Sequence, residues 1–152
     1  MSVLIDTPVW SLALRRKAAQ LNRTEQHLVE EWKTLVWDGR AHLAGIIRQE
    51  VLSGIRDAGD FERLRGRLAA FDDVPAGAAD HERAASYSNA CRAKGVTPTA
   101  FDMLICALAT RHELAIFTAD TDFIRYAKIL PIKLHKVRPS SGGARRRTTR
   151  AD

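Results

Sequence analysis

The chain has 152 residues, of which 45% are hydrophobic and 28% charged, and its formal net charge is +6. These values are ordinary for a globular protein with one buried core. No apolar run is long enough to cross a membrane, and the first residues lack the features of a signal peptide, so we expect a cytoplasmic protein without membrane association. The five histidines and the two lone cysteines, Cys91 and Cys106, show no metal-ligand spacing, which argues against a zinc site.

The positive charge is concentrated at the carboxyl end. Residues 136–152 contain six lysine or arginine residues and one aspartate, so residues 1–135 carry a net charge of only +1. The sequence PSSGGA at residues 139–144 is typical of a flexible linker. We therefore expect a folded domain over residues 1–137 and a disordered basic tail over residues 138–152. Such a tail can add non-specific affinity for nucleic acid, or serve only solubility.

Short apolar runs alternate with amphipathic segments along the first 137 residues. A buried strand is predicted at residues 3–5, and Thr7 and Pro8 suit the cap and first position of a helix that reaches about residue 19. A second helix is predicted from Thr24 to the Asp-Gly stop at residues 38–39, followed by a strand at 41–44.

The later segments continue the alternation. They predict a helix after Gly45, a helix capped by Asp60, an extended segment at 72–75, a helix at 80–94, a helix opened by residues 97–99, a strand at 115–118, a helix at 123–128 and an edge strand at 129–137. Strands that alternate with helices predict an α/β fold, in which a central, mainly parallel sheet is flanked by helices.

Four acidic residues lie where a strand ends or where a charge is unfavourable. Asp6 ends the first strand, and Asp120, closely followed by Asp122, comes just after the strand at 115–118. Glu50 and Asp102 lie in helices rich in apolar residues. Each has a structural alternative, because Asp6 can cap a helix, Asp102 can favour a helix N-terminus and Glu50 can face solvent. Together they predict a cluster at one sheet edge. Carboxylates that repel one another need a cation, and oxygen ligands favour Mg²⁺ or Mn²⁺.

Four segments carry these acids: DTPVW at residues 6–10, IRQEVLSG at 47–54, TAFDMLICA at 99–107 and TADTDF at 118–123. In this order and spacing they resemble the acidic motifs of the PIN-domain family. Within that family they are most similar to the VapC-type toxin ribonucleases of bacterial type II toxin–antitoxin systems. The resemblance covers residues 2–135 and implies a PIN-like α/β/α sandwich.

The resemblance also implies an activity, a cofactor and partners. The expected protein is a Mg²⁺-dependent endoribonuclease that hydrolyses RNA phosphodiester bonds, forms a homodimer, and is held inactive in a hetero-oligomer with a small VapB-like antitoxin. The implied catalytic quartet is Asp6, Glu50, Asp102 and Asp120. Of these, Asp6, Asp102 and Asp120 are the implied metal ligands. The secondary candidates are Asp122, which competes with Asp120, and Thr118, whose hydroxyl matches a position beside the quartet.

Other acid-rich α/β proteins fit less well. A phosphatase of the haloacid dehalogenase type needs a second aspartate two residues after Asp6, where this chain has Pro8. A receiver domain needs an acidic pair near the first strand and a lysine after a late strand, and neither is evident. A PIN-like scaffold that binds RNA or protein without cleaving it stays open as an alternative, although all four acids are present.

Two surfaces are predicted for the partners. Arginine and lysine side chains expected near the acids are candidates for phosphate contacts, namely Arg48, Arg56, Lys94 and Arg125. Apolar residues of the first helix predict an exposed face that an antitoxin helix can cover, namely Val9, Trp10, Leu12 and Leu14, beside the stripe of Leu28, Trp32 and Leu35. The alternative for this face is ordinary core or a dimer interface.

Overall fold

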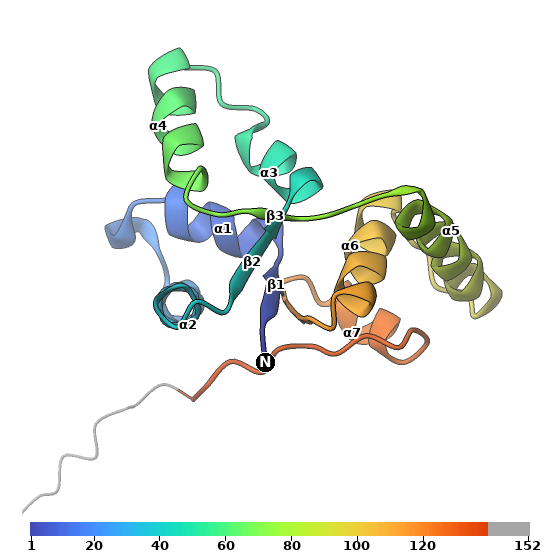
Figure 1. The fold of residues 1–152 in the computed structure, drawn as a ribbon. Helices are drawn as coiled ribbons and strands as arrows, with labels where there is room; N and C mark the ends of the chain where they lie inside the picture. The colour runs from blue at the N-terminus through green and yellow to red at the C-terminus, as the bar shows by residue number, and fades with distance from the viewer. Residues whose placement is uncertain (140–152) are drawn as a thin grey trace, which may run out of the picture.

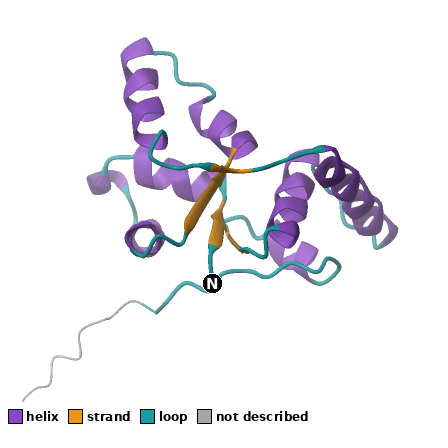
Figure 2. Ribbon diagram, in the orientation of Figure 1, coloured by secondary structure: helices purple, strands orange, loops and turns teal. Residues whose placement is uncertain are grey.

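The computed structural model describes residues 1–139 and has a four-stranded parallel sheet at its centre (Figure 1 and Figure 2). The strands are β1 (Val3–Ile5), β2 (Ala41–Ala44), β3 (Asp73–Val74) and β4 (Ala115–Phe117), in the order β3-β2-β1-β4. Val3 pairs with both Ala41 and Ala115, so β1 lies between β2 and β4. The three residues of β1 are fully buried, as their unbroken apolar run predicted.

Helices cover both faces of the sheet. Their bounds are α1 (Thr7–Leu14), α2 (Arg23–Trp37), α3 (Gly45–Leu52), α4 (Ala58–Leu68), α5 (Ala78–Ala93), α6 (Ala100–Arg111) and α7 (Asp122–Ala127), with a 3₁₀ turn, η1, at Ala18–Gln20. In Figure 1, α1, α2 and α4 lie on one side of the sheet, and α5, α6 and α7 lie on the other. The predicted α/β class, with a parallel sheet flanked by helices, is confirmed. None of the described helices is long and apolar enough to cross a membrane.

The capping residues of three helices differ from the sequence prediction. The cap of α1 is Asp6 and not Thr7, because the Asp6 carboxylate accepts a hydrogen bond from the Thr7 N–H at 2.8 Å. The cap of α2 is Asn22 and not Thr24, since Asn22 and Glu25 form a reciprocal capping box. In α4, likewise, the cap is Asp57 and not Asp60. The first helix also ends at Leu14, well before residue 19. The local sequence offered several side-chain acceptors, and the earlier one forms the cap in each case.

The predicted edge strand over residues 129–137 is reduced to one bridge beside β4. Leu134 pairs with Ile116 in parallel, through hydrogen bonds that join the Ile116 backbone to Lys133 O and His135 N at 2.8 Å each. The preceding residues cannot extend the pairing, because the N–H groups of residues 129 and 130 donate to Tyr126 O and Pro131 has no N–H.

The predicted basic tail lies outside the described residues, except for Arg138 and Pro139. Arg138 pairs with the buried carboxylate of Glu31 at 3.3 Å, and His135 contacts the other oxygen of Glu31 at 2.7 Å. Arg138 therefore contacts the folded part of the chain through α2.

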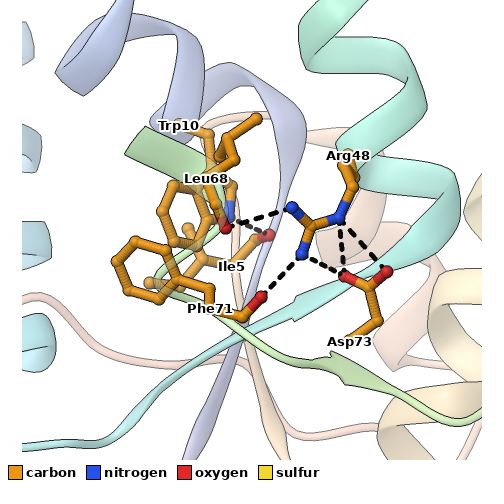
Figure 3. A network of polar contacts seen from close by, with 6 residues as sticks. All are labelled: Ile5, Trp10, Arg48, Leu68, Phe71 and Asp73. Atoms are coloured by element: carbon orange, nitrogen blue, oxygen red, sulfur yellow. Dashed lines mark hydrogen bonds and ion pairs between the residues drawn. The ribbon is translucent and has the colours of Figure 1, made fainter. Parts of the chain in front are cut away.

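The predicted exposed face of α1 is partly wrong. Val9 and Trp10 are fully buried, and the Trp10 indole N–H donates to Ile5 O at 2.9 Å (Figure 3). The Trp10 ring makes edge-on contacts with Trp32 and Phe71, with ring centroids 5.6 and 4.8 Å apart. Trp10 therefore belongs to the core and joins β1, α2 and the loop after α4.

Arg48 also differs from its predicted role as a phosphate contact. Its guanidinium donates to the backbone oxygens of Leu68 and Phe71 at 3.0 and 2.6 Å, and pairs with the Asp73 carboxylate at 2.9 Å (Figure 3). These contacts join α3 to the chain that leads into β3. Arg48 is therefore a structural residue whose donors are already engaged.

Candidate active site

The carboxyl ends of β1 and β4 bring two distant segments together. Ile5 and Phe117 are register partners, and the next residue, Asp6, donates its N–H to Phe117 O at 2.8 Å. The Thr118 hydroxyl donates to Oδ2 of Asp6 at 2.8 Å and accepts the N–H of Asp120 at 3.0 Å. One hydroxyl thus links the acids that follow the two central strands, as expected at the carboxyl edge of a parallel sheet.

Asp6 is a helix cap and a buried carboxylate at once. Its Oδ1 accepts the Thr7 N–H, its Oδ2 accepts the Thr118 hydroxyl, and the residue is only 4% exposed. The pKa of Asp6 is raised to about 6, mainly by burial and to a smaller extent by the nearby carboxylates of Asp102 and Glu50, while the two hydrogen bonds oppose the change. Asp6 therefore does cap α1, as the structural alternative had it, while the burial of its second oxygen against Thr118 is a feature that the cap does not require.

Asp102 enters the site from the first turn of α6. Thr99 caps this helix by accepting the Asp102 N–H at 3.0 Å, and Asp102 is 8% exposed. Burial raises the pKa of Asp102, and repulsion from Asp120 and Asp122 adds to this effect.

Tyr126 supports Asp102 from the opposite helix, α7. Its hydroxyl donates to Oδ2 of Asp102 at 3.1 Å, and the pKa of Tyr126 is raised by burial and by the Asp102 charge. Tyr126 was not among the predicted site residues. Its position is one of the apolar positions of a short helix, and no local pattern indicates where its hydroxyl points.

Glu50 and Asp120 complete the acidic group. Glu50 is exposed in the last turn of α3, and its Oε2 accepts the Thr7 hydroxyl at 2.8 Å. Asp120 is half-buried, and its Oδ1 accepts the Asp122 N–H at 2.9 Å. The Asp122 carboxylate instead forms an ion pair with Arg125.

All four predicted acids line one small cavity, which we call the acid cavity. Its volume is about 160 Å³, and its lining residues are Asp6, Thr7, Pro8, Glu50, Phe101, Asp102 and Asp120. Asp122 does not line it, so the geometry favours Asp120 of the two competing candidates. Within residues 1–139, no group of three or more His, Cys, Asp or Glu side chains is arranged so that it could hold a metal ion as the side chains stand. Uncompensated carboxylates repel one another, which is consistent with four acids that share a cavity without forming a coordination shell.

Two larger grooves flank α1. The α1–α2 groove has a volume of about 620 Å³, and its lining includes Pro8, Leu12, Arg16, Leu28 and Ala119. The α1–α4 groove has a volume of about 710 Å³ and lies between the end of α1 and the segment from residue 54 to α4. Both exceed the acid cavity in size, but neither gathers buried carboxylates, so the chemistry singles out the smaller cavity.

Comparisons with known proteins agree with this architecture. A model of the PIN domain family matches residues 3–129. FitAcB from Neisseria gonorrhoeae has a similar structure, with 20% identity and a TM-score of 0.65 over 88% of this chain and 96% of that one. VapBC2 from Rickettsia felis, bound to a DNA fragment from their promoter, is 15% identical with a TM-score of 0.66, over 89% of this chain and 98% of that one. FitAB bound to an IR36 DNA fragment is 20% identical with a TM-score of 0.67, over 88% of this chain and 93% of that one. No curated protein matches the sequence.

Proposed function

Because the chain belongs to the PIN domain family, we propose that it is a Mg²⁺-dependent endoribonuclease and the VapC-type toxin of a toxin–antitoxin pair. The acid cavity is the observation that carries the proposal. Asp6 and Asp102 are buried there with raised pKa values, beside Glu50 and Asp120. Desolvated carboxylates that repel one another cost folding stability, and a function at the site explains why they are kept together.

The donor set fits a hard divalent cation. The cavity offers carboxylate and hydroxyl oxygens and no sulfur or imidazole ligand among its lining residues, which suits Mg²⁺ or Mn²⁺. Asp6, Asp102 and Asp120 would hold the ion. When bound, it supplies a water of lowered pKa and neutralises charge on the scissile phosphate.

The chain's own residues hold these carboxylates in place. The Thr118 hydroxyl donates a hydrogen bond to one oxygen of Asp6, and the Tyr126 hydroxyl donates one to an oxygen of Asp102. These bonds fix the orientation of the two buried carboxylates. Glu50 lies on the exposed side, where the Thr7 hydroxyl holds Oε2 and leaves Oε1 available to accept a proton from an attacking water.

The antitoxin contact is proposed for the α1–α2 groove. This groove begins at Pro8 and Ala119, next to the acid cavity, and its apolar lining includes Leu12 and Leu28. An apolar helix that lies along the groove would bring a cationic side chain to the acids at its end. Structural similarity to FitAB and VapBC supports a partner of this class.

The activity test uses the purified chain and total RNA, with Mg²⁺ or with EDTA, and the cut ends are read by sequencing. We expect cleavage with Mg²⁺, none with EDTA, and none by the Asp102→Asn variant. The matched control is Asp72→Asn, which removes an exposed carboxylate away from the cavity and should cleave like the parent. RNA binding without metal-dependent cleavage by the parent would instead establish a non-catalytic scaffold.

The toxin assignment has its own test. Induction of the chain should stop growth, and co-expression of the neighbouring open reading frame should restore growth and allow the two products to be purified together. Failure of both results would remove the toxin assignment and leave the nuclease activity to be judged by the RNA experiment.

A further inference from the structure

The α1–α4 groove differs from the rest of the described surface in its charge. Five cationic side chains line it, namely Arg15, Lys17, Arg56, Arg63 and Arg67, against only two carboxylates, Asp57 and Asp60, which gives a net charge of +3. Residues 1–135 as a whole carry only +1. The positive charge of the folded part is therefore concentrated in this groove.

The cations of the groove are mostly unneutralised. Asp60 is paired with Arg63, and Asp57 caps α4 through the Asp60 N–H. Within residues 1–139, Arg15, Lys17 and Arg56 form no ion pair, and all three are exposed. They are therefore available to a negatively charged ligand.

The lining between these cations is apolar. Leu14, Ile55 and Leu64 lie in the same groove as the arginine and lysine side chains. Cations spaced along a groove fit the charged backbone of a single-stranded nucleic acid, and the aliphatic side chains between them can contact the faces of its bases, although no described residue of the groove has an aromatic side chain on which a base could stack.

Two elements lead from the acid cavity to this groove. α1 starts at Thr7, beside the acids, and ends at Leu14 in the groove, about 10 Å further on at the usual helical rise. α3 carries Glu50 in its last turn, and the chain reaches Arg56 six residues later. In Figure 1 the end of α1 lies next to the end of α4, and Arg67 contacts Leu14 O at 3.4 Å.

From these observations we propose that the α1–α4 groove binds the phosphate backbone of the single-stranded RNA substrate on one side of the scissile bond. This inference rests on the proposed function and adds the path of the substrate: RNA passes from the acid cavity along α1 and the end of α3 to the groove cations. The α1–α2 groove, proposed for the antitoxin, shares only Arg15 with the α1–α4 groove. The proposal therefore places substrate and antitoxin in different grooves.

The test compares two double variants of the full chain with equal loss of charge. Lys17→Gln/Arg56→Gln removes two cations that line only the α1–α4 groove. Arg83→Gln/Lys128→Gln removes two exposed cations on the opposite side of the sheet, from α5 and the end of α7. Binding of a fluorescein-labelled oligoribonucleotide of mixed sequence is measured at several salt concentrations in EDTA, so that the metal-dependent reaction does not consume it.

We expect the slope of log K against log salt to fall by about 1.4 in the groove variant, since each lost single-strand phosphate contact removes about 0.7. The control variant should keep the parent slope. With Mg²⁺, kcat/KM of the groove variant should fall while its single-turnover rate at saturating RNA stays at the parent value, because neither residue lines the acid cavity. Unfolding temperatures of both variants close to that of the parent exclude a folding defect.

Three results would overturn the inference. The first is an equal salt slope in both variants, and the second is no RNA binding by the parent. The third is a groove variant that binds RNA like the parent but no longer co-purifies with the neighbouring gene product, which would make the groove a protein contact. Failure of the proposed function looks different. In that case the groove variant loses its salt slope while the parent cleaves no RNA with Mg²⁺.

Discussion

Replacement of Asp6 by asparagine should stabilise the metal-free protein while it abolishes the reaction. The pKa of Asp6 rises from 3.8 to about 6 on folding, mainly through burial, and this difference corresponds to about 3 kcal/mol of destabilisation when the carboxylate is ionised. Asparagine cannot accept both present hydrogen bonds, from the Thr7 N–H and the Thr118 hydroxyl, and the lost bond costs about 1 kcal/mol. The net gain at pH 7.5 is therefore about 2 kcal/mol, or about 4 to 8 °C in Tm for a chain of this size.

The pH dependence distinguishes this cause from a general stabilisation. A carboxyl whose pKa is raised in the folded state is neutral, and without penalty, below the unfolded value of 3.8. Its contribution to stability is lost as the pH rises through about 6. The advantage of Asp6→Asn should therefore be full at pH 7.5, shrink below about pH 6 and reverse near pH 4, where the lost hydrogen bond leaves the variant about 1 kcal/mol less stable than the parent.

The assay is urea and thermal unfolding in EDTA from pH 4 to pH 8, with Asp72→Asn as the control that should not change. Addition of Mg²⁺ should then raise the Tm of the parent, because the ion binds preferentially to the folded state. The Tm of Asp6→Asn should not change. An asparagine variant no more stable than the parent at pH 7.5, or a gain that persists at pH 4, would refute the reasoning.

Three more changes probe the supports of the site. Tyr126→Phe removes the hydroxyl that holds Asp102 and should lower the single-turnover cleavage rate and the Mg²⁺-induced rise in Tm; parent values for both would make the hydrogen bond irrelevant to the reaction. Arg48→Gln leaves two backbone oxygens and the Asp73 carboxylate without their donor. Urea unfolding should therefore show a free energy of unfolding lower by about 2 to 3 kcal/mol. A decrease below about 0.5 kcal/mol would mean that these contacts do not stabilise the fold. Deletion of residues 139–152 should flatten the salt dependence of RNA binding and leave the single-turnover rate unchanged; an unchanged slope would make the tail a bystander, and a large fall in rate would show that it reaches the acids.

The position of the acids could be predicted because it depends on short-range patterns. The apolar run of residues 3–5 predicts a buried strand, and parallel strands place their carboxyl ends at one edge of the sheet. The two predicted strands therefore place Asp6 and Asp120 at the same sheet edge, and the observed pairing of β1 with β4 makes them neighbours. Glu50 and Asp102 were selected because each lies in a helix rich in apolar residues, the PIN resemblance then assigned the four acids to one quartet, and all four line the acid cavity.

The roles that sequence could not assign depend on contacts between distant residues. Arg48 lies on a helix beside Glu50 and was predicted to face phosphate, but its partners are 20 to 25 residues further along the chain. Trp10 was predicted to be exposed, yet its ring is covered by Trp32 and Phe71. Hydrophobic periodicity marks such a position as apolar and leaves open whether it faces the core or a partner.

The pairing of β1 with β4 determines when the acid cavity can form during synthesis. The hydrogen bond from the Thr118 hydroxyl to Asp6 spans 112 residues. Asp6 therefore leaves the ribosome long before the segment that carries its Thr118 partner. Contacts of such long sequence separation form late and slowly. A nascent chain that has emerged only as far as α6 holds Asp6, Glu50 and Asp102 but lacks β4 and Thr118. The complete acid cavity therefore appears only after β4 and Thr118 have been synthesised, which delays the proposed nuclease activity until most of the described residues have left the ribosome.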